Sequence, residues 1–215
     1  MLPQILDVLI NLTRNIPIDE LEKRLRPTIC GNDWCGASSA GFIAPEESLF
    51  ERIKSDYDTL LGMGVDYEQM AAWSKTAFEM EPLTYQKPSL LKRLFAFGKE
   101  PPETRYDKNR FMVMAVGSCG FQDCPWGCHE DKFGYPTYSG THTYIFEKDS
   151  SGKPPINAEE VGDEGANTYL SKKAFLVVTG LTPHLIASHG FFEGNTPYRT
   201  NPERLLEFIN SGKKK

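Results

Sequence analysis

The first hundred residues carry the apolar spacing that is typical of helices. Leucine and isoleucine recur at intervals of three and four in several stretches, which Pro and Gly separate from one another. A proline followed by two acids, at 45–47, is typical of a helix start. Asp66 and Gln69 have the spacing of a capping box, in which each side chain accepts a backbone N–H of the other residue. The four predicted helices cover residues 3–14, 18–25, 45–62 and 67–79.

The second half of the chain contains three stretches rich in β-branched and aromatic residues, which predict strands. They cover residues 110–118, 141–148 and 173–180. The first and third are nearly continuous apolar runs, so we expect these two to be the central strands of a sheet. Residues 149–168 are polar and rich in Gly and Pro, and we expect them to form an exposed excursion between the second and third strands.

Two short helices are predicted after the last strand. Thr182 is suited to capping a helix over 183–189, and Gly190 is suited to the left-handed position just beyond its end. An Asn-Pro pair at 201–202 predicts the start of an amphipathic helix that runs to about residue 210. The chain therefore ends in helices.

The two adjacent prolines Pro101 and Pro102 separate the helical stretches from the strands. The sequence thus predicts an α+β fold, with a mainly helical region over 1–100 and a β-rich region over 101–215 that contains a small antiparallel sheet, a zinc knuckle and short C-terminal helices. A length of 215 residues fits one domain, so we expect the two regions to pack together.

Composition narrows the classes of function. A formal net charge of -5 argues against nucleic-acid binding as the main role, because phosphate contacts need clustered Lys and Arg. No run of eighteen apolar residues is present, so no membrane span is expected. The apolar N-terminus lacks a basic region and a cleavage pattern, which indicates a cytoplasmic protein. Five cysteines in such a chain predict reduced thiols rather than disulfides, and clustered thiols suggest a metal.

The stretch SCGFQDCPWGCHED, residues 118–131, holds three cysteines, a histidine and three acids. Structural zinc sites take thiolate and imidazole ligands in two local pairs. Cys124 and Cys128 supply the first pair, and His184 and His189 on the predicted helix supply the second. The order of the ligands is similar to that of two-cysteine, two-histidine zinc fingers, although 55 residues separate the pairs here. We therefore expect a structural zinc bound by these four residues.

Other ligand sets remain open. Cys119 can join Cys124 and Cys128, with His129 or His142 as the fourth ligand, in a site with three cysteines and one histidine. The other two cysteines, Cys30 and Cys35, are expected to be buried packing residues. A redox dithiol is disfavoured because the cysteine spacings are not Cys-x-x-Cys and no predicted helix starts at these cysteines.

The turn-rich stretch GFFEGNTPYRTNP, residues 190–202, combines aromatic residues with an arginine. Such residues are favoured at recognition surfaces. We expect instead that Phe191 and Phe192 cover the zinc site and anchor the last helix, and that Arg199 pairs with an acid.

The functional expectation follows from the metal. A zinc ion with four protein ligands has no open position for a catalytic water, so we expect a non-enzymatic, zinc-stabilised cytosolic interaction protein with an unknown protein partner. The alternative is a metal- or thiol-dependent enzyme with a site between the two halves of the chain, and the third is a nucleic-acid-binding zinc module. No phosphate-binding glycine loop, nucleophile elbow or His-Glu-x-x-His motif is present.

Overall fold

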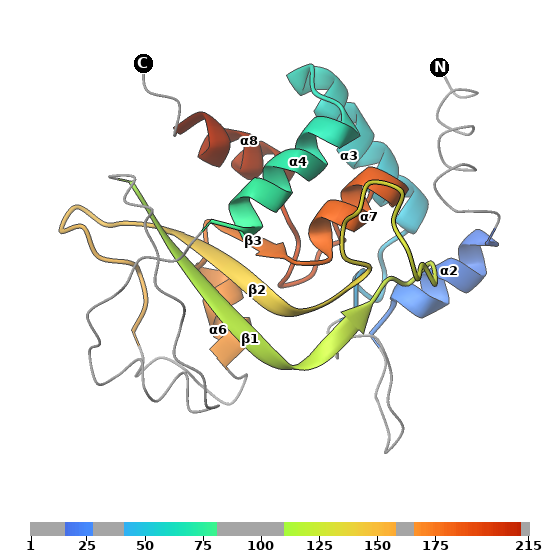
Figure 1. Ribbon diagram of the computed structural model, residues 1–215, viewed down its shortest axis with the longest axis horizontal. Coiled ribbons are helices and arrows are strands. Elements are labelled where there is room, and N and C mark those ends of the chain that lie inside the picture. The colour runs from blue at the N-terminus through green and yellow to red at the C-terminus, as the bar shows by residue number, and fades with distance from the viewer. Residues whose placement is uncertain (1–15, 28–40, 81–109, 158–165, 212–215) are drawn as a thin grey trace.

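The computed structural model describes residues 16–27, 41–80, 110–157 and 166–211, and within these ranges the side chains outside 118–121. These residues form an α+β fold in which helices precede a small antiparallel sheet and further helices follow it (Figure 1). The predicted helix over 3–14 and the residues Cys30 and Cys35 lie outside the described ranges. The elements are α2 (Ile18–Leu25), α3 (Leu49–Met63), α4 (Tyr67–Phe78), β1 (Phe111–Asp123), β2 (Tyr138–Glu147), α6 (Ala166–Lys173), β3 (Leu176–Thr179), α7 (Thr182–His189) and α8 (Pro202–Ser211).

The helices of the first half follow the predicted pattern, with one wrong boundary. Helix α2 has the predicted bounds, and α4 begins with the complete capping box of Asp66 and Gln69. Helix α3 ends at Gly64, whose φ of 68° is the left-handed conformation that glycine adopts readily. The start predicted at 45–47 is wrong, because Ser48 is the cap and its side chain accepts the N–H of Glu51.

The sheet has the strand order β1-β2-β3, with both pairings antiparallel. Among the described residues β2 is therefore the central strand, and the expectation that the first and third strands are central was wrong. Their apolar runs have another cause, since helices cover both faces of the sheet and residues of either parity along β1 and β3 are buried. An apolar strand indicates that both of its faces are buried. It does not require another strand to pair with each of its edges.

Helix α6 was not expected. It begins at Ala166, inside the stretch expected to be an exposed excursion, and it extends to Lys173, where a strand was predicted to begin. The helix buries Tyr169 and Leu170 against the face of the sheet that carries Tyr144. Strand β3 consequently begins only at Leu176.

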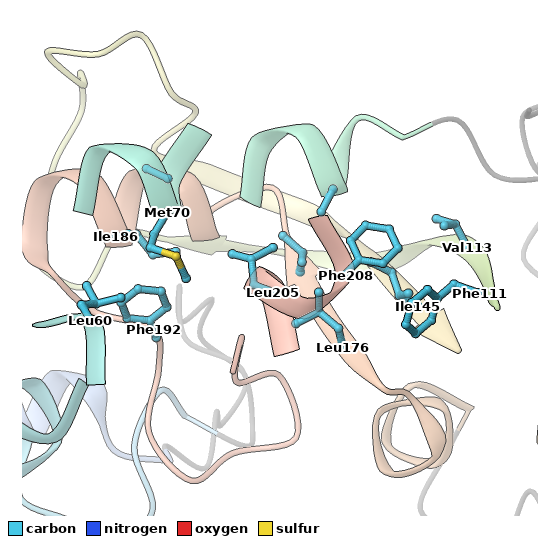
Figure 2. Packing of buried hydrophobic residues seen from close by; sticks show 13 residues of the cluster. Leu60, Met70, Phe111, Val113, Ile145, Leu176, Ile186, Phe192, Leu205 and Phe208 are labelled. Carbon is cyan, nitrogen blue, oxygen red and sulfur yellow. The ribbon is translucent and has the colours of Figure 1, made fainter. Parts of the chain in front are cut away.

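The opposite face of the sheet lies under α4 and α8 (Figure 2). Phe111 of β1 contacts Phe208 of α8 edge to face, with ring centroids 5.4 Å apart, and Phe192 and Leu205 extend the same cluster towards Met70 of α4. Packing of this kind joins helices from the first half of the chain to strands and helices from the second half.

Helix α7 follows β3 directly and packs against α4. Thr182 is its first residue rather than its cap. The Thr182 hydroxyl accepts the N–H of Thr179 at 3.0 Å, which fixes the tight turn from strand to helix. Helix α8 begins as predicted, with the Asn201 side chain accepting the N–H of Arg204 at 2.9 Å. Within the described ranges, no helix combines the length and apolarity needed to cross a membrane.

Candidate metal centre

Two separate segments carry the Cys and His residues of the candidate site. Cys124 follows the end of β1, and its N–H donates to the carbonyl of Thr137 at 2.9 Å. The chain then reverses through a tight turn, in which Gly127 has a φ of 70° and donates its N–H to the carbonyl of Cys124 at 2.8 Å. This left-handed glycine brings Cys128 back beside Cys124.

Helix α7 carries the two histidines on its buried side. His189 is the last helical residue, and Gly190 follows with a φ of 58°. The N–H of Phe191 donates to the carbonyl of Leu185, which completes a left-handed helix end of the Schellman type. Although His184 and His189 are five residues apart, both imidazoles reach the same cluster, and their ring centroids are 5.1 Å apart.

Four predicted ligands come together in this cluster. One potential ligand atom from each of Cys124, Cys128, His184 and His189 lies within 4.8 Å of all the others. Nε2 of His189 is 3.4 Å from Sγ of Cys124 and 3.3 Å from Sγ of Cys128. A tetrahedral zinc ion with the usual bond lengths separates its sulfur and nitrogen ligands by about 3.6 Å. The cluster thus has the composition and nearly the dimensions of a Cys₂His₂ metal site.

His184 is oriented by Asp131. Its Nδ1 donates to the Asp131 carboxylate, which also accepts from the hydroxyl of Ser188 at 2.6 Å and from the backbone N–H groups of Phe133 and Tyr135. Nδ1 therefore carries the proton, and the lone pair of His184 lies on Nε2. That Nε2 atom is buried and has no hydrogen-bond partner among the described residues. A carboxylate that holds the far nitrogen of a histidine is the usual outer contact of a metal-binding imidazole.

The surroundings of Asp131 favour the ionised form of its side chain. Burial raises the pKa of Asp131, but the hydrogen bonds from Ser188, His184 and the loop backbone outweigh that effect, and the net pKa lies below the usual value. The acid is therefore ionised at neutral pH and can orient His184.

The two thiols influence each other strongly. The hydrogen bond from Cys124 lowers the pKa of Cys128, with further help from His184 and His189. The same contact, together with burial, raises the pKa of Cys124. One thiolate is therefore favoured in the bare cluster and a second is opposed by charge repulsion. A divalent cation between the sulfurs would remove that repulsion and permit both thiolates.

An aromatic shell encloses the cluster. The indole of Trp126 stacks on the His189 ring with centroids 4.1 Å apart and an angle of 10°, and Phe191 meets Trp126 edge to face. Leu21 and Leu25 of α2 belong to the same apolar cluster as the two cysteines. The exposed fractions of Cys124, Cys128, His184 and His189 are 4%, 7%, 0% and 0%. The group is thus shielded from solvent on all sides.

The reserve ligands do not join this group. His129 is exposed on the loop after Cys128, and His142 lies on β2 against the rings of Tyr144 and Tyr198. Cys119 is in β1, where its side chain is not described. The Cys₂His₂ combination is therefore the one that the described residues bring together.

The contacts of Phe191, Phe192 and Arg199 were expected from the sequence, and the contact of Asp131 was not. Phe191 covers the Cys/His cluster and Phe192 packs with the last helix, as expected, while Arg199 pairs with the buried acid Asp56. The role of Asp131 was missed. Its signal was present, since it is the acid three positions after Cys128 in the cysteine-rich stretch, but nothing in the sequence links it to a histidine 53 positions away.

Comparisons with known proteins return no match: no family model, no curated protein and no solved structure resembles this chain significantly. The chain is an α+β protein with a buried Cys/His group that can bind a metal ion.

Proposed function

We propose that this protein binds one zinc ion through Cys124, Cys128, His184 and His189, and that the ion stabilises the fold. The observation that carries the proposal is the buried Nε2 of His184, for which the described part of the chain offers no hydrogen-bond partner while Asp131 holds the opposite nitrogen. A buried polar atom without a partner costs free energy, and a metal ion among four converging ligands removes that cost. Two thiolates with two imidazoles are a ligand set preferred by zinc.

The proposed role of zinc is structural. Four protein ligands complete a tetrahedron, and the aromatic shell leaves little room for a substrate. The ion would tie the loop that follows β1 to the end of α7. It would thereby fix α2, which packs on the same cluster.

The wider proposal is a non-enzymatic interaction protein of the cytosol, where reduced thiols are maintained. Support comes from the loop between the cysteines and β2. Phe133, with an exposed fraction of 37%, and Tyr138 at the start of β2, with 58%, present aromatic surface to solvent beside the site. Aromatic side chains held on a rigid support are favoured at protein interfaces.

A thiol enzyme is the second candidate, and one observation favours it. Cys128 lies in the same cluster as His184, and Asp131 holds His184, so the three residues have the types of a nucleophile, a base and an orienting acid. Burial of Cys128 and of both imidazoles argues against it, because a substrate would have to displace the Trp126 and Phe191 shell. Slow alkylation of native Cys128 by iodoacetamide, with fast alkylation after chelation, is expected for the zinc site. Rapid alkylation of the native protein would favour the enzyme.

Elemental analysis tests the zinc proposal. Protein purified without a chelator should contain close to one zinc per chain. Cys128→Ser and His184→Ala should each lose the metal, because each removes one of four ligands. The matched controls His129→Ala and His142→Ala should retain it, since neither residue lies in the cluster. Metal-free protein of unchanged fold, or retention of zinc by both ligand variants, would overturn the proposal.

A further inference from the structure

A pocket of about 500 Å³ is lined by residues of helix α6, of strand β3 and of the segment 195–204, which includes the start of α8. It shares no residue with the Cys/His cluster. Its volume is in the range of sites that hold a small molecule. The pocket is therefore a candidate ligand site that is independent of the proposed metal.

Charge distinguishes this pocket from the rest of the chain. Lys172, Arg199 and Arg204 line it, and no Asp or Glu from the described ranges does. The whole chain carries a net charge of -5, so a concavity whose charged lining residues, among those described, are all cations is unlike the average surface. A pocket of one sign raises the local concentration of ligands of the opposite sign.

The side chain of Arg204 is held in place by two contacts with Phe175. One of its terminal nitrogens donates to the carbonyl of Phe175 at 2.9 Å, and its guanidinium lies 5.5 Å from the centroid of the Phe175 ring. Guanidinium has five N–H donors, and only this one has a hydrogen-bond partner among the described residues. The remaining donors form the fork that binds phosphate in a bidentate manner.

Arg199 is a second arginine of the lining that other residues hold in place. It forms an ion pair with the buried Asp56 and donates to the carbonyl of Glu193, so its side chain cannot swing away. Asn201 lines the pocket between the two arginines and caps α8. The first turn of α8 therefore also directs its partial positive charge to this side.

Part of the remaining lining is apolar, and Ala174, Leu176, Val177 and Pro197 contribute to that part. The other residues include the polar Ser171, Asn195 and Thr196. A ligand that satisfies both surfaces has an anionic group and a compact hydrophobic part. We propose that this pocket binds a small phosphorylated organic molecule, with its phosphate on Arg204 and its apolar part against Ala174 and Val177.

Phenyl phosphate is a suitable probe, and benzyl alcohol supplies the ring without the charge. Amide chemical shifts of the ¹⁵N-labelled full chain, recorded at low salt, should change on addition of phenyl phosphate in residues 171–177 and 195–204. Benzyl alcohol should cause little change. Affinity should fall as salt is added, because the attraction is partly electrostatic.

Substitutions of the lining residues test whether phenyl phosphate binds in this pocket. Arg204→Gln should weaken phenyl phosphate binding about tenfold or more, since a charge-assisted hydrogen bond contributes roughly 1.5–3 kcal/mol. Lys172→Gln is a second test, because Lys172 is an exposed residue of the pocket lining. It should weaken phenyl phosphate binding less than Arg204→Gln does. Arg24→Gln, on the distant helix α2, is the matched control and should leave binding unchanged.

Several results would overturn the proposal. They are the absence of shifts at about 10 mM probe, shifts confined to other segments, equal binding of benzyl alcohol, or unchanged affinity in a folded Arg204→Gln protein. Binding of a phosphotyrosine peptide about tenfold tighter than phenyl phosphate would reassign the pocket to a protein partner. None of these outcomes depends on whether zinc is bound.

Discussion

Asp131 accepts a hydrogen bond from Nδ1 of His184, and this contact aims the other imidazole nitrogen at the two cysteine sulfurs. The acid and the histidine are 53 positions apart, so the contact also joins the loop after Cys128 to helix α7. Orientation of a ligand and closure of the fold therefore depend on the same carboxylate.

Replacement of Asp131 by Asn should weaken zinc binding about 10- to 100-fold without abolishing it. The amide cannot hold Nδ1–H of His184 with the strength of a carboxylate, and outer contacts of this kind contribute by that amount. Competition with a chromophoric chelator measures the change. The control is Asp58→Asn, which removes an exposed acid of α3 that pairs with Lys54 in the preceding turn. Equal zinc affinity of the Asp131→Asn protein and the wild type would show that His184 needs no support.

Chelation of zinc should destabilise the residues around the Cys/His cluster before it destabilises the rest of the fold. Cys124 and Cys128 share an apolar cluster with Leu21 and Leu25 of α2, so loss of the ion should open this cluster. Hydrogen exchange should accelerate in α2, in residues 124–137 and near the end of α7.

The cluster between the sheet and helices α4 and α8 provides the internal control for chelation. Phe111, Leu205 and Phe208 belong to it and make no contact with the Cys/His group, so the surrounding amides should keep more of their protection (Figure 2). Unchanged exchange throughout the chain would show that the metal does not support the fold, and would favour a catalytic role.

His142 should make the protein sensitive to acid. Its exposed fraction is 6%, neither ring nitrogen has a hydrogen-bond partner within the described ranges, and burial lowers its pKa from 6.5 to about 4. The titratable side chains that face it are Tyr144 and Tyr198, both uncharged in this range. Between pH 6.5 and 4 the unfolded chain binds a proton that the folded chain does not, so the free energy of unfolding decreases as the pH falls.

Between pH 7 and 4.5 this one residue should reduce the free energy of unfolding by about 2 kcal/mol. His142→Phe keeps a ring against Tyr198 and removes the titration. Urea unfolding at both pH values should therefore show a smaller acid loss in the variant than in the wild type. Equal losses in the two proteins would mean that His142 is hydrated or paired in the native state.

Local sequence signals determined much of this protein. Asp66 with Gln69 and Gly64 specify helix ends through hydrogen bonds and backbone conformations that involve only neighbouring residues. Gly127 and Gly190 likewise permit the left-handed turns that aim the cysteine pair and close α7. The ligand pairs themselves could be predicted because zinc coordination restricts both the residue types and their spacing.

Strand order and helix α6 were not determined in this way. The apolar runs of β1 and β3 are the same whether a strand is central or at an edge, because helices cover both faces of this sheet. Helix α6 has only eight residues, and its stability depends on the burial of Tyr169 and Leu170 against β2 rather than on its own propensity.

The sequence by itself determined several of the helix caps, the left-handed glycines and the types of the candidate metal ligands, because each depends on chemistry between close neighbours. The tertiary structure alone decided that Asp131 meets His184, that Trp126 stacks on His189, and that His142 is buried away from the cysteines. These contacts join positions more than fifty residues apart. They form only when the packing of sheet and helices brings the segments together, and no local pattern encodes that distance.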